Sequence, residues 1–127
     1  MIEFKKRNSG RAQGDCPVMV TAYGRKDEPA VVHLQLKLHS ELMRESGWRH
    51  GDAAVVSFED DTWTLIRTLN RSEGFMVTRP HKGSPAGAIK ITADRRTLGE
   101  LGLSVRQPRR CIVLDKSEQR ITVRYEF

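Results

Sequence analysis

Apolar and polar residues alternate along several short segments of the chain. Such alternation is typical of β-strands that bury one face, because successive side chains of a strand point to opposite sides of the sheet. Residues that favour turns, such as Gly, Pro and Asp, separate these segments from one another. The pattern predicts strands over residues 18–23, 30–38, 54–58, 63–67, 75–78, 88–92, 111–114 and 121–125.

Part of this pattern occurs twice. The segment LQLKLHSELMRESGW begins at Leu34, and the segment IKITADRRTLGELGL begins 55 positions later, at Ile89. Their alternating apolar positions coincide, and Gly47 aligns with Gly102. A repeat of this kind predicts two related halves that share one hydrophobic core. The alternative is that two β-rich segments show the same periodicity by coincidence.

Each copy also contains the signals of one short helix. Ser40 and Asp94 are suitable N-cap residues, because their side chains can accept a hydrogen bond from a free backbone N–H. Gly47 and Gly102 are suited to the left-handed conformation that ends many helices. The sequence therefore predicts a mainly β fold with two short helices, one in each half.

The length and composition agree with one compact domain. The chain has 127 residues, of which 38% are hydrophobic and 30% charged, as in ordinary globular proteins. We expect residues 1–16 to form a basic, flexible arm and linker, residues 17–70 the first half and residues 71–127 the second half.

The sequence favours a cytoplasmic location without membrane contact. No apolar run approaches the ~20 residues of a membrane helix, and the charged start MIEFKKR lacks the apolar core of a signal peptide. Cys16 and Cys111 are too few and too far apart in the chain for a disulfide framework or a zinc site. We expect two reduced thiols, with Cys111 in a core strand and Cys16 in the linker.

Positive charge is concentrated in the second half. Residues 1–70 contain 10 Lys and Arg against 10 Asp and Glu, whereas residues 71–127 contain 12 against 6, so the second half accounts for the formal net charge of +6. Such a surface favours a polyanionic partner, because each neutralised phosphate releases counterions. The alternative is an ordinary solvated surface. The predicted phosphate contacts are Arg79, Lys82, Arg95, Arg96, Arg109 and Arg110, and Arg106 belongs to the same cluster as the last two.

The stretch from Val18 to Arg67 resembles the swapped-hairpin domain of AbrB- and MazE-like DNA-binding proteins. The resemblance rests on an alternating strand, a short helix that ends before a glycine, a turn with Gly and Asp, and a final hairpin. The matching residues are LQLKLHSELMRESGWRHGDAAVVSFEDDTWTLIR. Residues 75–125 match the same outline more loosely, and the first half is also similar to SymE-like toxins. The resemblance implies an AbrB-like swapped-hairpin β-barrel formed by two pseudo-symmetric halves of one chain.

The resemblance also implies a DNA-contacting face at Arg25, Lys26 and Arg44. Family members have an arginine pair early in the helix; here Arg44 matches one arginine and Met43 takes the other place. Family domains usually dimerise to complete one barrel. A duplicated chain would close the barrel by itself, so we expect a monomer or a homodimer whose two sides need not be equivalent.

No pattern in the sequence indicates catalysis. The four histidines show no HExxH or other close metal-ligand spacing, and we expect no metal site. There is no P-loop, no GxSxG motif and no Rossmann glycine pattern, so we expect no cofactor and no enzymatic activity. Trp48 and Trp63 follow the strand and helix pattern and are expected in the core, and with 6% aromatic residues a stacking surface for single strands is not expected.

Three functional hypotheses remain open. The first is a small bacterial or phage DNA-binding regulator, with double-stranded DNA as its partner. The second is a protein-interaction module, such as a toxin–antitoxin component or a phage inhibitor of a host protein, whose basic face docks on an acidic protein. The third is a SymE-like toxin that acts on RNA.

Overall fold

The computed structural model describes residues 16–25 and 27–126. Most of the predicted N-terminal arm and Lys26 therefore lie outside the described residues. The elements, in chain order, are β1 (Val18–Gly24), β2 (Val31–Leu38), α2 (Ser40–Ser46), β3 (Ala53–Glu59), β4 (Thr62–Thr68), β5 (Phe75–Met76), β6 (Gly87–Asp94), η1 (Arg95–Thr97), β7 (Arg109–Lys116) and β8 (Arg120–Tyr125). The prediction of a mainly β fold is confirmed, and each predicted strand segment overlaps one of the observed strands.

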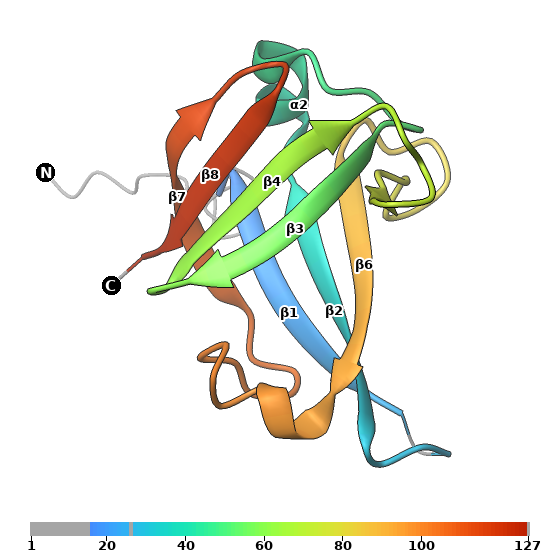
Figure 1. Cartoon of the computed structure of the whole chain (residues 1–127), viewed down its shortest axis with the longest axis vertical. Helices are drawn as coiled ribbons and strands as arrows, with labels where there is room; N and C mark the ends of the chain where they lie inside the picture. The colour runs from blue at the N-terminus through green and yellow to red at the C-terminus, as the bar shows by residue number, and fades with distance from the viewer. Residues whose placement is uncertain (1–15, 26, 127) are drawn as a thin grey trace, which may run out of the picture.

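The eight strands form one antiparallel sheet in the order β5-β3-β4-β8-β7-β1-β2-β6. The sheet curls into a nearly closed barrel (Figure 1), because the segment at β5 lies between β3 and β6, the long strands at the two ends of the strand order. On one side β5 pairs with β3 through Ala53 and Met76. On the other side Thr78 and Ala88 exchange two backbone hydrogen bonds, of 2.9 and 2.8 Å, which join the segment to β6.

Pairs of strands from the two halves alternate around the barrel. β2 pairs with β6 along its whole length, and β4 pairs with β8, so strands at corresponding positions of the predicted repeat meet. β1 pairs with β7, through Val18 and Cys111, and β5 pairs with β3, through Phe75 and Ala54. Each half therefore depends on strands of the other half for its hydrogen bonds, and neither half is a separate layer.

The connections divide the barrel into two different ends. α2 follows the end of β2 and precedes β3, whereas η1 follows β6 and precedes β7. Because β2 and β6 are antiparallel, α2 and η1 lie at opposite ends of the barrel (Figure 1). We call these the α2 end and the η1 end. The described residues of the turn between β1 and β2, 25 and 27–30, also lie at the η1 end.

The first predicted helix is present with one change at its start. The N-cap is His39, whose Nδ1 accepts a hydrogen bond from the backbone N–H of Glu41 at 3.1 Å, and the predicted cap Ser40 is the first helical residue. Gly47 ends the helix in the left-handed conformation, with a φ of 81°.

The prediction of a second helix of the same kind is wrong. Only one turn of 3₁₀-helix forms, at Arg95–Thr97, and the side chain of its N-cap Asp94 makes no capping hydrogen bond. The α2 sequence SELMRES contains strong helix formers, whereas η1 is followed by Gly99 soon after the β-branched Thr97. Gly102 adopts the expected left-handed conformation, with a φ of 66°, but it ends a series of turns.

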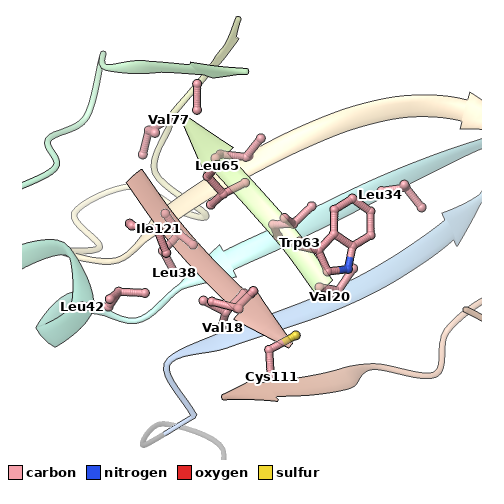
Figure 2. Packing of buried hydrophobic residues seen from close by; sticks show 14 of the residues in the cluster. Val18, Val20, Leu34, Leu38, Leu42, Trp63, Leu65, Val77, Cys111 and Ile121 are labelled. Atoms are coloured by element: carbon pink, nitrogen blue, oxygen red, sulfur yellow. The ribbon is translucent and has the colours of Figure 1, made fainter. Parts of the chain in front are cut away.

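Inward-facing side chains of the strands form one hydrophobic core (Figure 2). Val18, Val20, Leu34 and Leu38 are at most 2% exposed, which explains why alternation is so regular in β1 and β2. Leu42 of α2 adds to the core at the α2 end. The predictions for the two tryptophans and Cys111 are confirmed, since Trp48 and Trp63 are each 2% exposed and Cys111 is fully buried. No helix among the described residues is long and apolar enough to cross a membrane.

The buried thiol of Cys111 makes stability sensitive to alkaline pH. Burial raises the pKa of Cys111 to about 12, whereas a thiol in an unfolded chain has a pKa of about 8.5. Between these two values the unfolded chain binds fewer protons than the folded protein, so the free energy of unfolding falls as pH rises. We expect urea denaturation to show this loss beginning at about pH 8.5, and to show less of it in Cys111→Val. Cys16→Ser leaves Cys111 as the single thiol, and a thiolate absorbance appearing near that pH in this folded variant would contradict the prediction.

Candidate nucleic-acid interface

Arg95 is held in place where η1 meets the β1–β2 turn. Its backbone N–H donates to Ala30 O at 2.8 Å, and its side-chain Nε donates to Pro29 O at 2.6 Å. The guanidinium then extends over the end of β1, where Gly24 leaves room for it. A Cβ at position 24 would lie 2.7 Å from Arg95 Nη2. The absence of a side chain at Gly24 thus permits the observed position of the Arg95 guanidinium.

Arg106 reaches the same place from the loop between η1 and β7. Its backbone N–H donates to Ala22 O at 2.8 Å, and the preceding residue, Val105, forms a parallel bridge with Ala22. Arg106 has a φ of 63°, which is uncommon for a residue with a side chain. Such conformations persist only where surrounding contacts hold them, and they cluster at functional sites.

Three arginines line one hollow at the η1 end. The hollow has a volume of about 200 Å³ and is lined by Gly24, Arg25, Arg95, Val105 and Arg106. No carboxylate contributes to this lining. Arginine presents several N–H donors in a fixed planar arrangement that matches phosphate oxygens. The arrangement is therefore suited to an anion with several acceptor oxygens, and the exposed Arg96 lies next to Arg95 in the chain.

The charges of the three arginines are compensated to different extents. Arg25 forms ion pairs with Asp27 at 2.9 Å and with Glu28 at 3.7 Å. The hydrogen bond from Arg25 lowers the pKa of Asp27, so this carboxylate stays ionised and keeps neutralising its partner. Arg95 and Arg106 form no ion pair with any residue in the described ranges. These two arginines are the ones whose charge is available to a ligand.

The α2 end has a larger groove with mixed charge. Its volume is about 670 Å³. The lining includes the cationic side chains of Arg44 and Arg49, but also the carboxylates of Glu41 and Glu118. Arg44 lies 3.8 Å from Glu41 in an exposed ion pair. An anionic ligand would meet repulsion as well as attraction here.

The loop between β5 and β6 carries two further predicted residues. Arg79 donates from Nη1 to Ser84 O at 2.6 Å, so its guanidinium stabilises the loop itself. Lys82 is exposed in the same loop. Pro85 of this loop lines the α2-end groove, which places the loop at that end of the barrel.

Arg109 and Arg110 are engaged on the side of the barrel. Arg109 donates from Nη1 to Gly102 O at 2.8 Å, and its guanidinium stacks 4.1 Å from the centre of the Tyr125 ring. Arg110 lies 3.4 Å from Glu126. Both guanidinium groups therefore have partners within the chain.

The structure thus brings together only some of the residues singled out by sequence. Arg25 and Arg95 meet at the η1 end, with Arg96 beside them, whereas Arg44 lies at the α2 end with Arg79 and Lys82. Eight-residue β2 separates Arg25 from Arg44, and a strand of that length spans roughly 23 Å. Arg106 completes the hollow, although sequence reasoning grouped it with Arg109 and Arg110 as a run of charge.

In the residues that the structure describes, no three His, Cys, Asp or Glu side chains gather closely enough to hold a metal ion. Comparison with protein-family models, with curated proteins and with solved structures finds no match. The proposal of a function therefore depends on the geometry and charge of this chain.

Proposed function

We propose that the protein is a small DNA-binding regulator, of bacterial or phage type, that contacts duplex phosphates through its η1 end. The observation that carries the proposal is the hollow lined by Arg25, Arg95 and Arg106 without a carboxylate. Arg96, which follows Arg95 in the chain, is also exposed.

Phosphate is the anion that best suits this hollow. Its oxygens accept hydrogen bonds from guanidinium groups in pairs, and such charge-assisted bonds are about twice as strong as neutral ones. The formal net charge of +6 adds long-range attraction to a polyanion. Arg25 would have to give up its ion pairs with Asp27 and Glu28 to bind a phosphate oxygen. Its contribution to the binding free energy is therefore smaller than that of Arg95 or Arg106.

We also propose that the fold is an internally duplicated form of the AbrB-like swapped-hairpin barrel. In its support, the β1–β2 hairpin takes its third strand, β7, from the second half, and β5 pairs with β3 of the first half. Such an exchange is what a swapped hairpin requires. Within one chain the two ends are free to differ, which fits an arginine-lined η1 end and a mixed α2 end.

The decisive experiment is a salt titration with a fluorescent duplex of about 20 base pairs, read by anisotropy. Each phosphate contact contributes a slope of about −0.9 to the plot of log K against log salt. Three to four contacts would therefore give a slope of roughly −3. Absence of binding at about 50 mM salt, or binding that does not change with salt, would exclude the proposal.

A second candidate is the protein-interaction module, because apolar side chains gather at β3, β4 and β5. Val55 and Ile66 are directly opposite each other on β3 and β4, and both are more than 40% exposed. Phe75 and Met76 of β5 are equally exposed, and Leu69 is 96% exposed. Exposed apolar clusters often mark protein contacts. Retention of a protein from nuclease-treated lysate, lost in Val55→Asp, would favour this candidate over the first.

A further inference from the structure

Three neighbouring strands present a second hollow on the outer face of the barrel. Tyr23 of β1 lies opposite His33 of β2, which lies opposite Thr92 of β6. In the next row of outward-facing residues, Gln35 lies opposite Lys90. The hollow has a volume of about 350 Å³ and is lined by Tyr23, His33, Leu34, Gln35 and Lys90. The three strands lie side by side in Figure 1.

Tyr23 is the unusual residue of this hollow. Trp48, Trp63 and Tyr125 are buried in the core, whereas Tyr23 is 45% exposed on the sheet surface. A tyrosine ring is flat and largely apolar, and any nucleobase can stack on its exposed face. Exposed aromatics on sheet faces bind unpaired bases in this way in single-strand-binding modules.

The polar groups around Tyr23 complement a nucleotide. The Nδ1 atom of His33 lies 3.2 Å from Thr92 Oγ1, a hydrogen bond that orients the imidazole. The amide of Gln35 offers both donors and an acceptor, as a base edge requires. Lys90 supplies an ammonium group and forms no ion pair with another residue of the described chain. No carboxylate lines the hollow, so an anionic ligand is not repelled there.

We propose that this hollow binds an unpaired nucleobase, with Tyr23 stacking on the base, Gln35 contacting its edge and Lys90 contacting a phosphate. This inference rests on the proposed nucleic-acid function and deepens it. A purely apolar ligand would leave Gln35 and Lys90 desolvated without partners. A bare phosphate would make no use of the Tyr23 ring.

The position of the hollow connects it to the arginines of the η1 end. Tyr23 lines this hollow, and the next residue, Gly24, lines the arginine hollow. A nucleic-acid strand bound by the arginines at the end of β1 can therefore continue onto the outer face of the sheet without crossing the barrel. Extended single strands, or a nucleotide unpaired from a duplex, fit this path, whereas a fully paired base cannot reach a sheet face with its stacking surface.

The test compares a fluorescent oligothymidylate of about ten nucleotides with a duplex of similar length, read by anisotropy at equal salt. In Tyr23→Ala the affinity for the single strand should fall roughly tenfold, since one stacked base is lost, while duplex affinity stays within about twofold. Tyr23→Phe keeps the stacking face and should bind like the parent protein. Met19→Ala is the matched control, because Met19 faces outward on the same strand but does not line the hollow.

Two results would overturn the inference while leaving the proposed function intact. One is a Tyr23→Ala variant that binds both the duplex and the single strand like the parent protein. The other is an NMR titration in which inorganic phosphate and thymidine monophosphate cause the same shifts at Tyr23 and Gln35. If the parent protein binds neither duplex nor single strand at low salt, the proposed function falls and this inference falls with it.

Discussion

Arg95→Ala together with Arg106→Ala should lower the affinity for duplex DNA roughly 60-fold at about 100 mM salt. These two arginines line the hollow at the η1 end and form no ion pair with the described residues, so their charge is available to phosphates. At this salt each lost phosphate contact costs about eightfold in affinity. The slope of log K against log salt should become less steep by about 2. Fluorescence anisotropy with a labelled duplex measures both quantities.

A matched control distinguishes the η1 end from overall charge. Arg49→Ala with Arg79→Ala removes the same charge from the α2 end, where Glu41 and Glu118 accompany the cations. This control should lower affinity only by the loss of long-range attraction, which is a few-fold. A larger loss in the control than in the η1 variant would move the interface to the α2 end. Arg95→Lys should recover the salt slope but only part of the affinity, because lysine lacks the planar pair of donors.

Trp63→Ala should lower the free energy of unfolding by about 3–5 kcal/mol. Trp63 is 2% exposed, and its ring lies 4.8 Å from that of Phe58, centre to centre. Its Nε1 donates to Tyr125 Oη at 3.1 Å. Tyr125 Oη in turn donates to Leu101 O in the loop after η1. One side chain therefore joins β4 of the first half to β8 and the η1 loop of the second half.

Such a loss is large beside the 5–15 kcal/mol by which domains are usually stable. Urea denaturation followed by circular dichroism measures it, and Trp48 remains as an independent fluorescent reporter in the variant. Tyr125→Phe separates hydrogen bonding from packing, because it keeps the ring but leaves the indole N–H of Trp63 without its acceptor. That change should cost about 1–3 kcal/mol. A Trp63→Ala protein within 1 kcal/mol of the parent would show that the aromatic cluster does not join the two halves as described.

The strands were predictable because their signal is local. Val18 and Val20, or Leu34 and Leu36, face the core at a spacing of two, and any chain that buries one face of a strand must show that spacing. The helix signals were less reliable. Asp94 and Gly102 resemble the ends of a helix, yet the residues between them have weak helix propensity, and only one 3₁₀ turn forms.

The candidate site was predictable only in part, because it depends on long-range pairing. Arg25 and Arg106 are far apart in the chain and meet because Val105 and Arg106 pair with the end of β1. Arg109 and Arg95 carry the same charge, so the sequence does not distinguish them. Only the fold shows that the guanidinium of Arg109 stacks on Tyr125. The sequence did not indicate the proposed role of Tyr23 for a related reason. An overall aromatic content of 6% does not show that one ring faces outward beside His33, Gln35 and Lys90.

The sequence by itself determined the β-strands, the membership of the core, the turn at Gly47 and the excess of positive charge in the second half. These features follow from side-chain periodicity, backbone preference and composition, which act over a few residues or need only counting. The tertiary structure decided which cations share a surface, which are neutralised by Asp27, Glu28 or Glu126, and which hollow has no carboxylate in its lining. The physical reason is that electrostatic and stacking interactions depend on distance in space, and strand pairing between the two halves sets those distances.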